Sequence, residues 1–63
     1  MSTDTYQPDR LRHGGGHVDR YTKTGQLVGH YRPDGSPIKH KGVLPPPIPA
    51  SDRAKFETAV AKL

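Results

Sequence analysis

Apolar and polar positions alternate through the middle of this chain, in a pattern that repeats every ten residues. Residues 21–30, YTKTGQLVGH, run directly into residues 31–40, YRPDGSPIKH, and a weaker copy with Gly15, Val18 and Arg20 at the same phases precedes them. Alternation interrupted by turn dipeptides is typical of antiparallel strands. The pattern therefore predicts a three-stranded antiparallel meander over residues 17–41.

The turn residues predict how these strands pair. Thr24-Gly25 and Asp34-Gly35 lie between the strand-like runs, and such dipeptides favour two-residue hairpin loops. Loops of that length would place Val18 opposite Tyr31, and Tyr31 opposite Ile38. The second turn also fits a type I turn led by Pro33. A slip of one residue in either loop would reverse the faces of a strand.

With two-residue loops the sheet has one apolar and one polar face, as a half-buried antiparallel sheet requires. The expected sheet core is Val18, Leu27, Tyr31 and Ile38. The opposite face carries a predicted polar row of Asp19, His30 and Lys39, with His17 and Arg32 nearby. His40 falls on the apolar face in this register.

The segments on either side of the meander have different compositions. Residues 1–16 are polar and end in three glycines, which predicts a flexible arm with Tyr6 and Leu11 as its only anchors. Residues 42–50, GVLPPPIPA, predict a stiff proline-rich strap in the polyproline II form.

The last segment, residues 51–63, predicts a short amphipathic helix. Ser51 is the expected N-cap, and Asp52 suits the positive end of the helix dipole. The apolar stripe at helical spacing is Phe56, Ala59, Val60 and Leu63. A helix of this length is marginal alone in water, so its stripe requires a surface, either the short sheet or another protein.

Composition limits how much of a core these elements can build. Leu, Ile, Val and Phe account for only eleven of the 63 residues, beside seven Pro and seven Gly. No Cys is present to form a disulfide, although small domains usually need such a constraint. The expected fold is a small α+β protein with little independent core.

The sequence contains no set of residues that predicts catalysis or metal binding. His13-Gly14-Gly15-Gly16 resembles the oxyanion-hole motif of lipases, but the chain lacks the Gly-x-Ser-x-Gly elbow that this motif requires. The four histidines, His13, His17, His30 and His40, offer no Cys partner and only Asp19 as a nearby carboxylate. We therefore expect polar-face hydrogen bonding rather than a metal site, no cofactor, no small-molecule substrate and no enzyme activity.

Two binding modes remain open. Pro46 and Pro49 have the minimal spacing of a ligand for an SH3 groove, but Val43 and Ser51 occupy the positions where a basic residue is expected. The net charge of +4 together with Tyr21 and Tyr31 allows contact with nucleic acid, although the predicted sheet buries Tyr31 and leaves one tyrosine for stacking. No recognised nucleic-acid-binding signature accompanies that charge.

The repeat itself resembles an element of small uncharacterised bacterial and phage proteins, of the form Tyr-x-Arg-x-Gly-x-x-Val-x-x-His-x-Arg. It covers residues 21–41, with Lys23 in place of an Arg and Pro37 in the last strand. The resemblance implies a small β-hairpin module. It implies no activity, and no site residues can be transferred.

These observations favour an accessory structural protein that clamps or cements larger subunits of an assembly, with a phage virion (capsid or head–tail region) as the expected setting. The expected partner-binding residues are Val43, Leu44 and Ile48 on the strap, and Phe56, Val60 and Leu63 on the helix. The alternative is a small basic module that binds nucleic acid or a host regulator. No apolar signal segment or membrane-length apolar run is present, so we expect a cytoplasmic or virion-incorporated protein.

Overall fold

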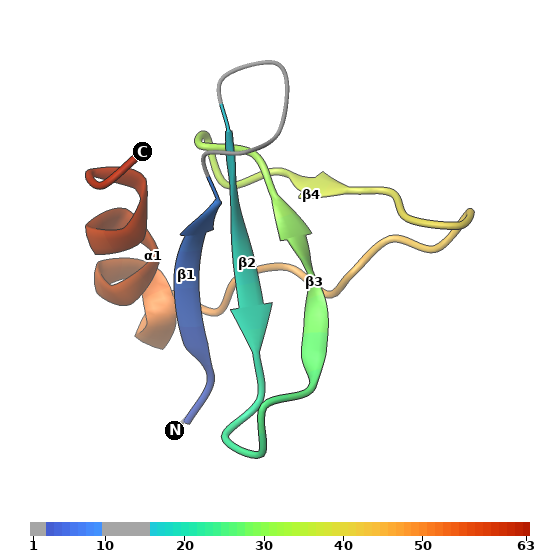
Figure 1. Ribbon diagram of the computed structural model, residues 1–63, viewed down its shortest axis with the longest axis horizontal. Helices are drawn as coiled ribbons and strands as arrows, with labels where there is room; N and C mark the ends of the chain where they lie inside the picture. The colour runs from blue at the N-terminus through green and yellow to red at the C-terminus, as the bar shows by residue number, and fades with distance from the viewer. Residues whose placement is uncertain (1–2, 10–15) are drawn as a thin grey trace.

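Four strands form one antiparallel sheet in the computed structural model, which describes residues 3–9 and 16–63 (Figure 1). The strands lie side by side in chain order and are β1 (Thr5–Asp9), β2 (His17–Tyr21), β3 (Leu27–Tyr31) and β4 (Pro37–Ile38). A 3₁₀ turn, η1 (Ala50–Asp52), leads into the helix α1 (Arg53–Val60). The fold is therefore α+β, as predicted, but with four strands in place of three.

The additional strand comes from the segment that was predicted to be a flexible arm. β1 pairs with β2 from Thr5 opposite Tyr21 to Asp9 opposite His17. Its burial alternates around the buried Tyr6, and its Pro8 is tolerated because β1 is an edge strand of the sheet. The prediction failed because one tyrosine among polar residues is too weak a period-two signal. Leu11 and His13 lie outside the described residues.

The first hairpin has a three-residue loop instead of the predicted two-residue loop. The amide of Thr22 donates to the carbonyl of Gln26 at 2.8 Å, and Gly25, with φ of 89°, donates back to Thr22 at 2.9 Å. A register shift between Arg20 and Tyr21 leaves one extra residue on β3. Because this bulge compensates for the longer loop, the predicted pairing of Val18 with Tyr31 is correct.

The second hairpin has the same three-residue loop but no bulge. Arg32 and Ser36 close the loop, and Gly35 occupies the left-handed position with φ of 96°. Pro33 leads the loop, which agrees with the type I alternative. Without compensation the register moves by one residue, so Tyr31 lies opposite Pro37, and Ile38 lies opposite His30. The predicted pairing of Tyr31 with Ile38 is therefore wrong.

The core lies between one face of the sheet and α1. Its buried apolar residues are Tyr6, Val18, Tyr31, Phe56 and Ala59, with Ile48, Val60 and Leu63 packed against them. Of the predicted sheet core, Val18 and Tyr31 are fully buried. Leu27 is 48% exposed and Ile38 is only half-buried. The bulge pairs Leu27 with Tyr21, and the shifted register pairs Ile38 with His30, so both side chains lie on the face of the sheet opposite the core.

The helix begins differently from the prediction. Ser51 lies inside η1, and Asp52 occupies the N-cap position without a side-chain capping bond. Asp52 is instead fully buried and bonded to Tyr6. Neither α1 nor η1, the helical elements of the described chain, is long and apolar enough to cross a membrane.

The proline-rich segment crosses the same face of the sheet as α1. The hydroxyl of Tyr31 donates to the carbonyl of Pro46, and the guanidinium of Arg20 donates to the carbonyl of Pro47 at 3.4 Å. Pro45 lies so close to Gly29 that a Cβ on Gly29 would be 2.4 Å from the Cβ of Pro45. Glycine at position 29 therefore permits the strap to contact the sheet.

Candidate functional site

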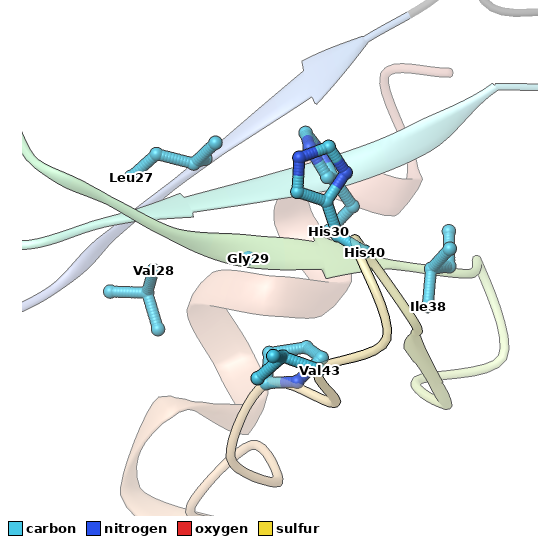
Figure 2. A pocket seen from close by; sticks show the side chains of 8 residues that line it. Leu27, Val28, Gly29, His30, Ile38, His40 and Val43 are labelled. Atoms are coloured by element: carbon cyan, nitrogen blue, oxygen red, sulfur yellow. The ribbon is translucent and has the colours of Figure 1, made fainter.

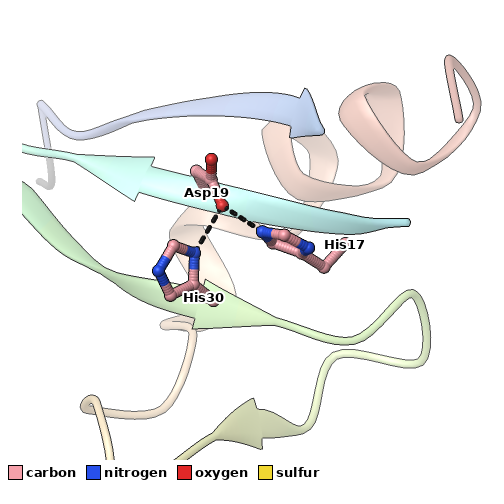
Figure 3. A group of neighbouring side chains, drawn as sticks. All are labelled: His17, Asp19 and His30. Carbon is pink, nitrogen blue, oxygen red and sulfur yellow. Dashed lines mark hydrogen bonds and ion pairs between the residues drawn. The ribbon is translucent and has the colours of Figure 1, made fainter. Parts of the chain in front are cut away.

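Three polar side chains converge on the face of the sheet opposite the strap (Figure 3). His17 and Asp19 come from β2, and His30 comes from β3 directly across from Asp19. The Nδ1 atom of His30 lies 2.6 Å from Oδ1 of Asp19, and the Nε2 atom of His17 lies 2.7 Å from the same oxygen. We call His17, Asp19 and His30 the histidine cluster.

Strand geometry explains this convergence. Residues 17 and 19 project from one face because side chains alternate along a strand, and antiparallel pairing sets His30 beside Asp19. The predicted polar row is thus confirmed for Asp19 and His30, with His17 beside them. Lys39 does not join them, because the shifted register places Ile38 opposite His30.

The same shift brings His40 to the cluster. Its ring centroid lies 5.6 Å from that of His30, and the His17 and His30 centroids are 4.8 Å apart. The prediction that His40 lies on the apolar face is therefore wrong. Asp9 completes the surroundings, with Oδ2 3.4 Å from Nε2 of His17.

His17 is the unusual member of the cluster. It is 4% exposed, and its Nε2 atom makes no hydrogen bond, although that atom lies 2.7 Å from Asp19. The short distance without a hydrogen bond means that the nitrogen and the carboxylate are close but poorly aligned. Such an arrangement can hold a charged imidazole beside a carboxylate, or can present donor atoms to a cation.

A separate apolar pocket of about 180 Å³ lies at the outer edge of β3 (Figure 2). β4 pairs only with His30 and Tyr31, so within the described chain the first part of β3 has no strand beside it on this side. We call this feature the β3-edge pocket, and it is lined by Leu27, Val28, Gly29, His30, Ile38, His40, Val43 and Pro45.

The exposed large apolar side chains of the described chain gather near this pocket. Val43 is 67% exposed, Leu44 is 54% exposed and Leu27 is 48% exposed, and two of them line the pocket. Val43 and Leu44 belong to the predicted partner-binding set. Leu27 was assigned to the sheet core, and no sequence signal revealed the bulge that exposes it.

The other predicted partner-binding residues have contacts inside the chain. Phe56 is 1% exposed, and Ile48, Val60 and Leu63 pack against the core that it joins. The sheet therefore provides the surface that the helix stripe requires. Their binding to a partner is untested, and as folded here they are occupied by the chain's own core.

A buried polar network connects side chains at the β1–β2 side of the sheet, away from the β3-edge pocket. The hydroxyl of Tyr6 donates to Asp52 at 2.6 Å, and Arg20 donates to Asp4 at 2.7 Å and lies 3.9 Å from Asp52. Burial, together with the hydrogen bond to Asp52, raises the pKa of Tyr6 above its ordinary value. Burial lowers the pKa of Arg20, but hydrogen bonds to Tyr31 and Asp4 outweigh it, so that this pKa is raised overall.

This network was not predicted from the sequence. Tyr6 was interpreted as a loose anchor and Asp52 as a residue favoured by the helix dipole. Their partnership spans 46 positions, and no local spacing reveals a contact of that range. Because the network links β1, β2 and η1 beneath the surface, we assign it to stability.

The same contacts change the charge pattern of the surface. Among the carboxylates, Asp4, Asp9, Asp19 and Asp52 have partners within the chain. Most basic residues of the described chain are exposed, namely Lys23, Arg32, Lys39, Lys41, Arg53, Lys55 and Lys62. The accessible surface is therefore more basic than the net charge of +4 suggests.

Comparison with known proteins leaves the geometry of the chain as the basis for assigning a function. No model of a protein family matches this chain, and no curated protein or solved structure matches it either.

Proposed function

We propose that this chain is an accessory structural protein that clamps a larger protein subunit, docking through the β3-edge pocket. The proposed setting is a large assembly such as a phage virion, at the capsid or the head–tail region. The observation that carries the proposal is the gathering of Leu27, Val43 and Leu44, the exposed large apolar side chains of the described chain, at one edge of the sheet. Exposed apolar side chains that cluster around a hollow are typical of protein-binding surfaces.

The size of the pocket favours a protein side chain as its occupant. Small-molecule sites span roughly 300–1,000 Å³, whereas this pocket measures about 180 Å³. A single apolar side chain of a partner would enter between Leu27 and Val43, and Leu44 would lie against the partner surface beside it.

Charge around the pocket further defines the partner. Lys39 and Lys41 are exposed within the loop that leads to Val43. An acidic rim on the partner would complement them and speed association, while the apolar contact would supply most of the affinity. The proposed partner is therefore a protein subunit that presents an apolar side chain flanked by carboxylates.

Site-specific photo-crosslinking in cells that make the native assembly tests this proposal. Leu44 is replaced by benzoylphenylalanine in one variant, and the exposed Ala54 on α1 is replaced in the control. We expect one discrete product with a larger subunit from position 44, retained on the sedimented particle, and none from position 54. Failure to crosslink, or the same products from both positions, would overturn the proposal.

A second candidate function is supported by the basic surface. The chain could bind nucleic acid or a host regulator through its exposed Lys and Arg residues, since its carboxylates are largely occupied internally. Binding to phosphates weakens steeply between low and moderate salt, whereas apolar docking persists. Release of the chain from the sedimented particle by salt or nuclease would select this second function.

A further inference from the structure

We propose that His17, Asp19 and His30 form a binding site for one divalent transition-metal ion, with Zn²⁺ as the best fit. This site lies beside the β3-edge pocket through His30, but it stands on different observations from those that support protein docking. The two proposals are therefore independent, and each has its own test.

The first observation is the convergence of ligand atoms. His17, Asp19 and His30 each offer one ligand atom, and these atoms lie within 4.8 Å of one another. Nε2 of His17 and Nδ1 of His30 both lie next to Oδ1 of Asp19. Zinc binds nitrogen and carboxylate oxygen at about 2.0–2.2 Å, so tetrahedral ligands lie roughly 3.4 Å apart. The nitrogen–oxygen distances of 2.6 and 2.7 Å need to open by less than about 1 Å, within reach of small side-chain rotations.

The second observation is the state of His17. Its Nε2 atom lies 2.7 Å from the Asp19 carboxylate within a side chain more than nine-tenths buried, but it is poorly aligned with that oxygen and has no hydrogen bond. A buried polar atom without a hydrogen bond is costly. A metal ion between Nε2 and Asp19 would give this nitrogen a bond along its lone pair and would hold the tautomer that leaves it unprotonated.

The donor set determines the class of metal. Two imidazoles and one carboxylate suit zinc and its transition-metal neighbours, whereas Mg²⁺ and Ca²⁺ prefer oxygen ligands alone. Three protein ligands leave at least one position for water or a further group. Two further possible ligands lie beside the cluster. Oδ2 of Asp9 is 3.4 Å from Nε2 of His17, and the ring of His40 lies against the ring of His30.

A bound ion would act as a cross-link in a chain that has no cysteine. Its ligands come from adjacent strands, β2 and β3, so the ion would fasten the central pair of the sheet. Ligand binding to the folded state alone stabilises that state by mass action. Metal loading should therefore appear as a higher melting temperature as well as a binding isotherm.

The experiment uses the untagged full chain, freed of metal with a chelator and titrated with ZnCl₂ by calorimetry. We expect one zinc per chain, a rise in Tm of at least about 5 °C at hundredfold excess over Kd, and no response to MgCl₂. The ring resonances of His17 and His30 should shift on titration. No stoichiometric binding, or unshifted His17 and His30 resonances, would overturn the site.

Variants locate the ion. His30→Gln is the main test, because His30 is less buried than His17 and the variant is expected to fold. We expect its zinc affinity to fall at least tenfold, with the same loss in Asp19→Asn. His13→Gln removes a histidine outside the proposed set and should bind like the parent chain. If His13→Gln loses zinc, or His30→Gln retains it, the assignment is wrong.

Leu44→Asp should leave zinc binding unchanged, which separates this test from that of protein docking.

Discussion

The two sides of the sheet differ in how they are covered. We call the β1–β2 side the closed end and the β3–β4 side the open end. At the β1–β2 end, α1 lies alongside the strands (Figure 1). Tyr6 and Phe56 are buried there, and their rings meet edge to face with centroids 6.2 Å apart. At the β3–β4 end the last strand has only two residues, and Leu27 and Val43 remain exposed around a pocket. Stability is thus concentrated at one end of the molecule, and surface suited to binding at the other.

This division shows how a very small chain can combine a buried core with an exposed apolar surface. Apolar residues are scarce, and the described chain places five of them in one buried cluster together with a polar network. The open end is held to that cluster by the strap, through the carbonyls of Pro46 and Pro47. The comparison predicts that substitutions at the two ends will have different effects on stability.

The largest expected effect is at Phe56. Phe56→Ala should lower the free energy of unfolding by about 3–5 kcal/mol, because the ring is 1% exposed in the centre of the core. A single core in a domain of this length, without disulfides, rarely supplies more than about 3–5 kcal/mol in total, so the variant should be largely unfolded. The measurement is the dispersion of its amide nitrogen–proton correlation spectrum.

Leu44→Ala is the matched substitution at the open end. Leu44 is 54% exposed, so truncation should change the free energy of unfolding by less than about 0.5 kcal/mol. Equal destabilisation by the two variants would mean that the strap belongs to the core. The division into a closed and an open end would then be incorrect.

The β2–β3 hairpin shows how far sequence reasoning reaches in this fold. The alternation around Val18 and Tyr31 was sufficient to predict their burial, because burial follows from local periodicity. Their predicted pairing is correct only because the unpredicted bulge offsets the unpredicted third residue of the loop. The pairing of Ile38 was not predicted correctly. The two turns have the same length and hydrogen-bond pattern, but only the first hairpin contains a bulge, so the two registers differ. Nothing in the repeat indicates which hairpin contains the bulge.

The candidate sites show the same limit. The proximity of Asp19 to His30 followed from the predicted register. Val43 and Leu44 are exposed, and their binding to a partner stays a prediction. The contacts of His40 depended on the second register and were missed. Contacts distant in the chain, such as Tyr6 with Asp52, arise from tertiary packing and have no local sequence pattern.

The second-largest expected effect is at Tyr6 in the closed end, and it depends on alkaline pH. Tyr6→Phe removes a hydrogen bond to a carboxylate and should cost about 1.5–3 kcal/mol at neutral pH. The raised pKa of Tyr6 favours its neutral form in the folded state. Its contribution is therefore complete below the ordinary tyrosine pKa of about 10 and is lost as the pH rises towards the higher folded value.

Urea denaturation of the parent chain and of Tyr6→Phe between neutral and strongly alkaline pH measures this contribution. The difference between the two should shrink once the pH exceeds about 10. Tyr21→Phe is the control, since Tyr21 lies on β2 outside the Tyr6–Asp52–Arg20 network. A constant difference across the alkaline range would show that Tyr6 is not protected by this network.

An effect between those of Tyr6→Phe and Leu44→Ala is expected at the junction between the two ends. Gly29→Ala places a Cβ 2.4 Å from that of Pro45, so the strap must move away from the sheet. Because Pro45 is not part of the core cluster around Phe56, we expect a loss of about 1 kcal/mol, well below that of Phe56→Ala. Amide resonances of Leu44 and Ile48 should shift, while those of Val18 and Ala59 stay in place. Shifts throughout the core would instead mean that the strap and the β1–β2 end form one cooperative unit, because displacing Pro45 would then disturb residues on the far side of the sheet.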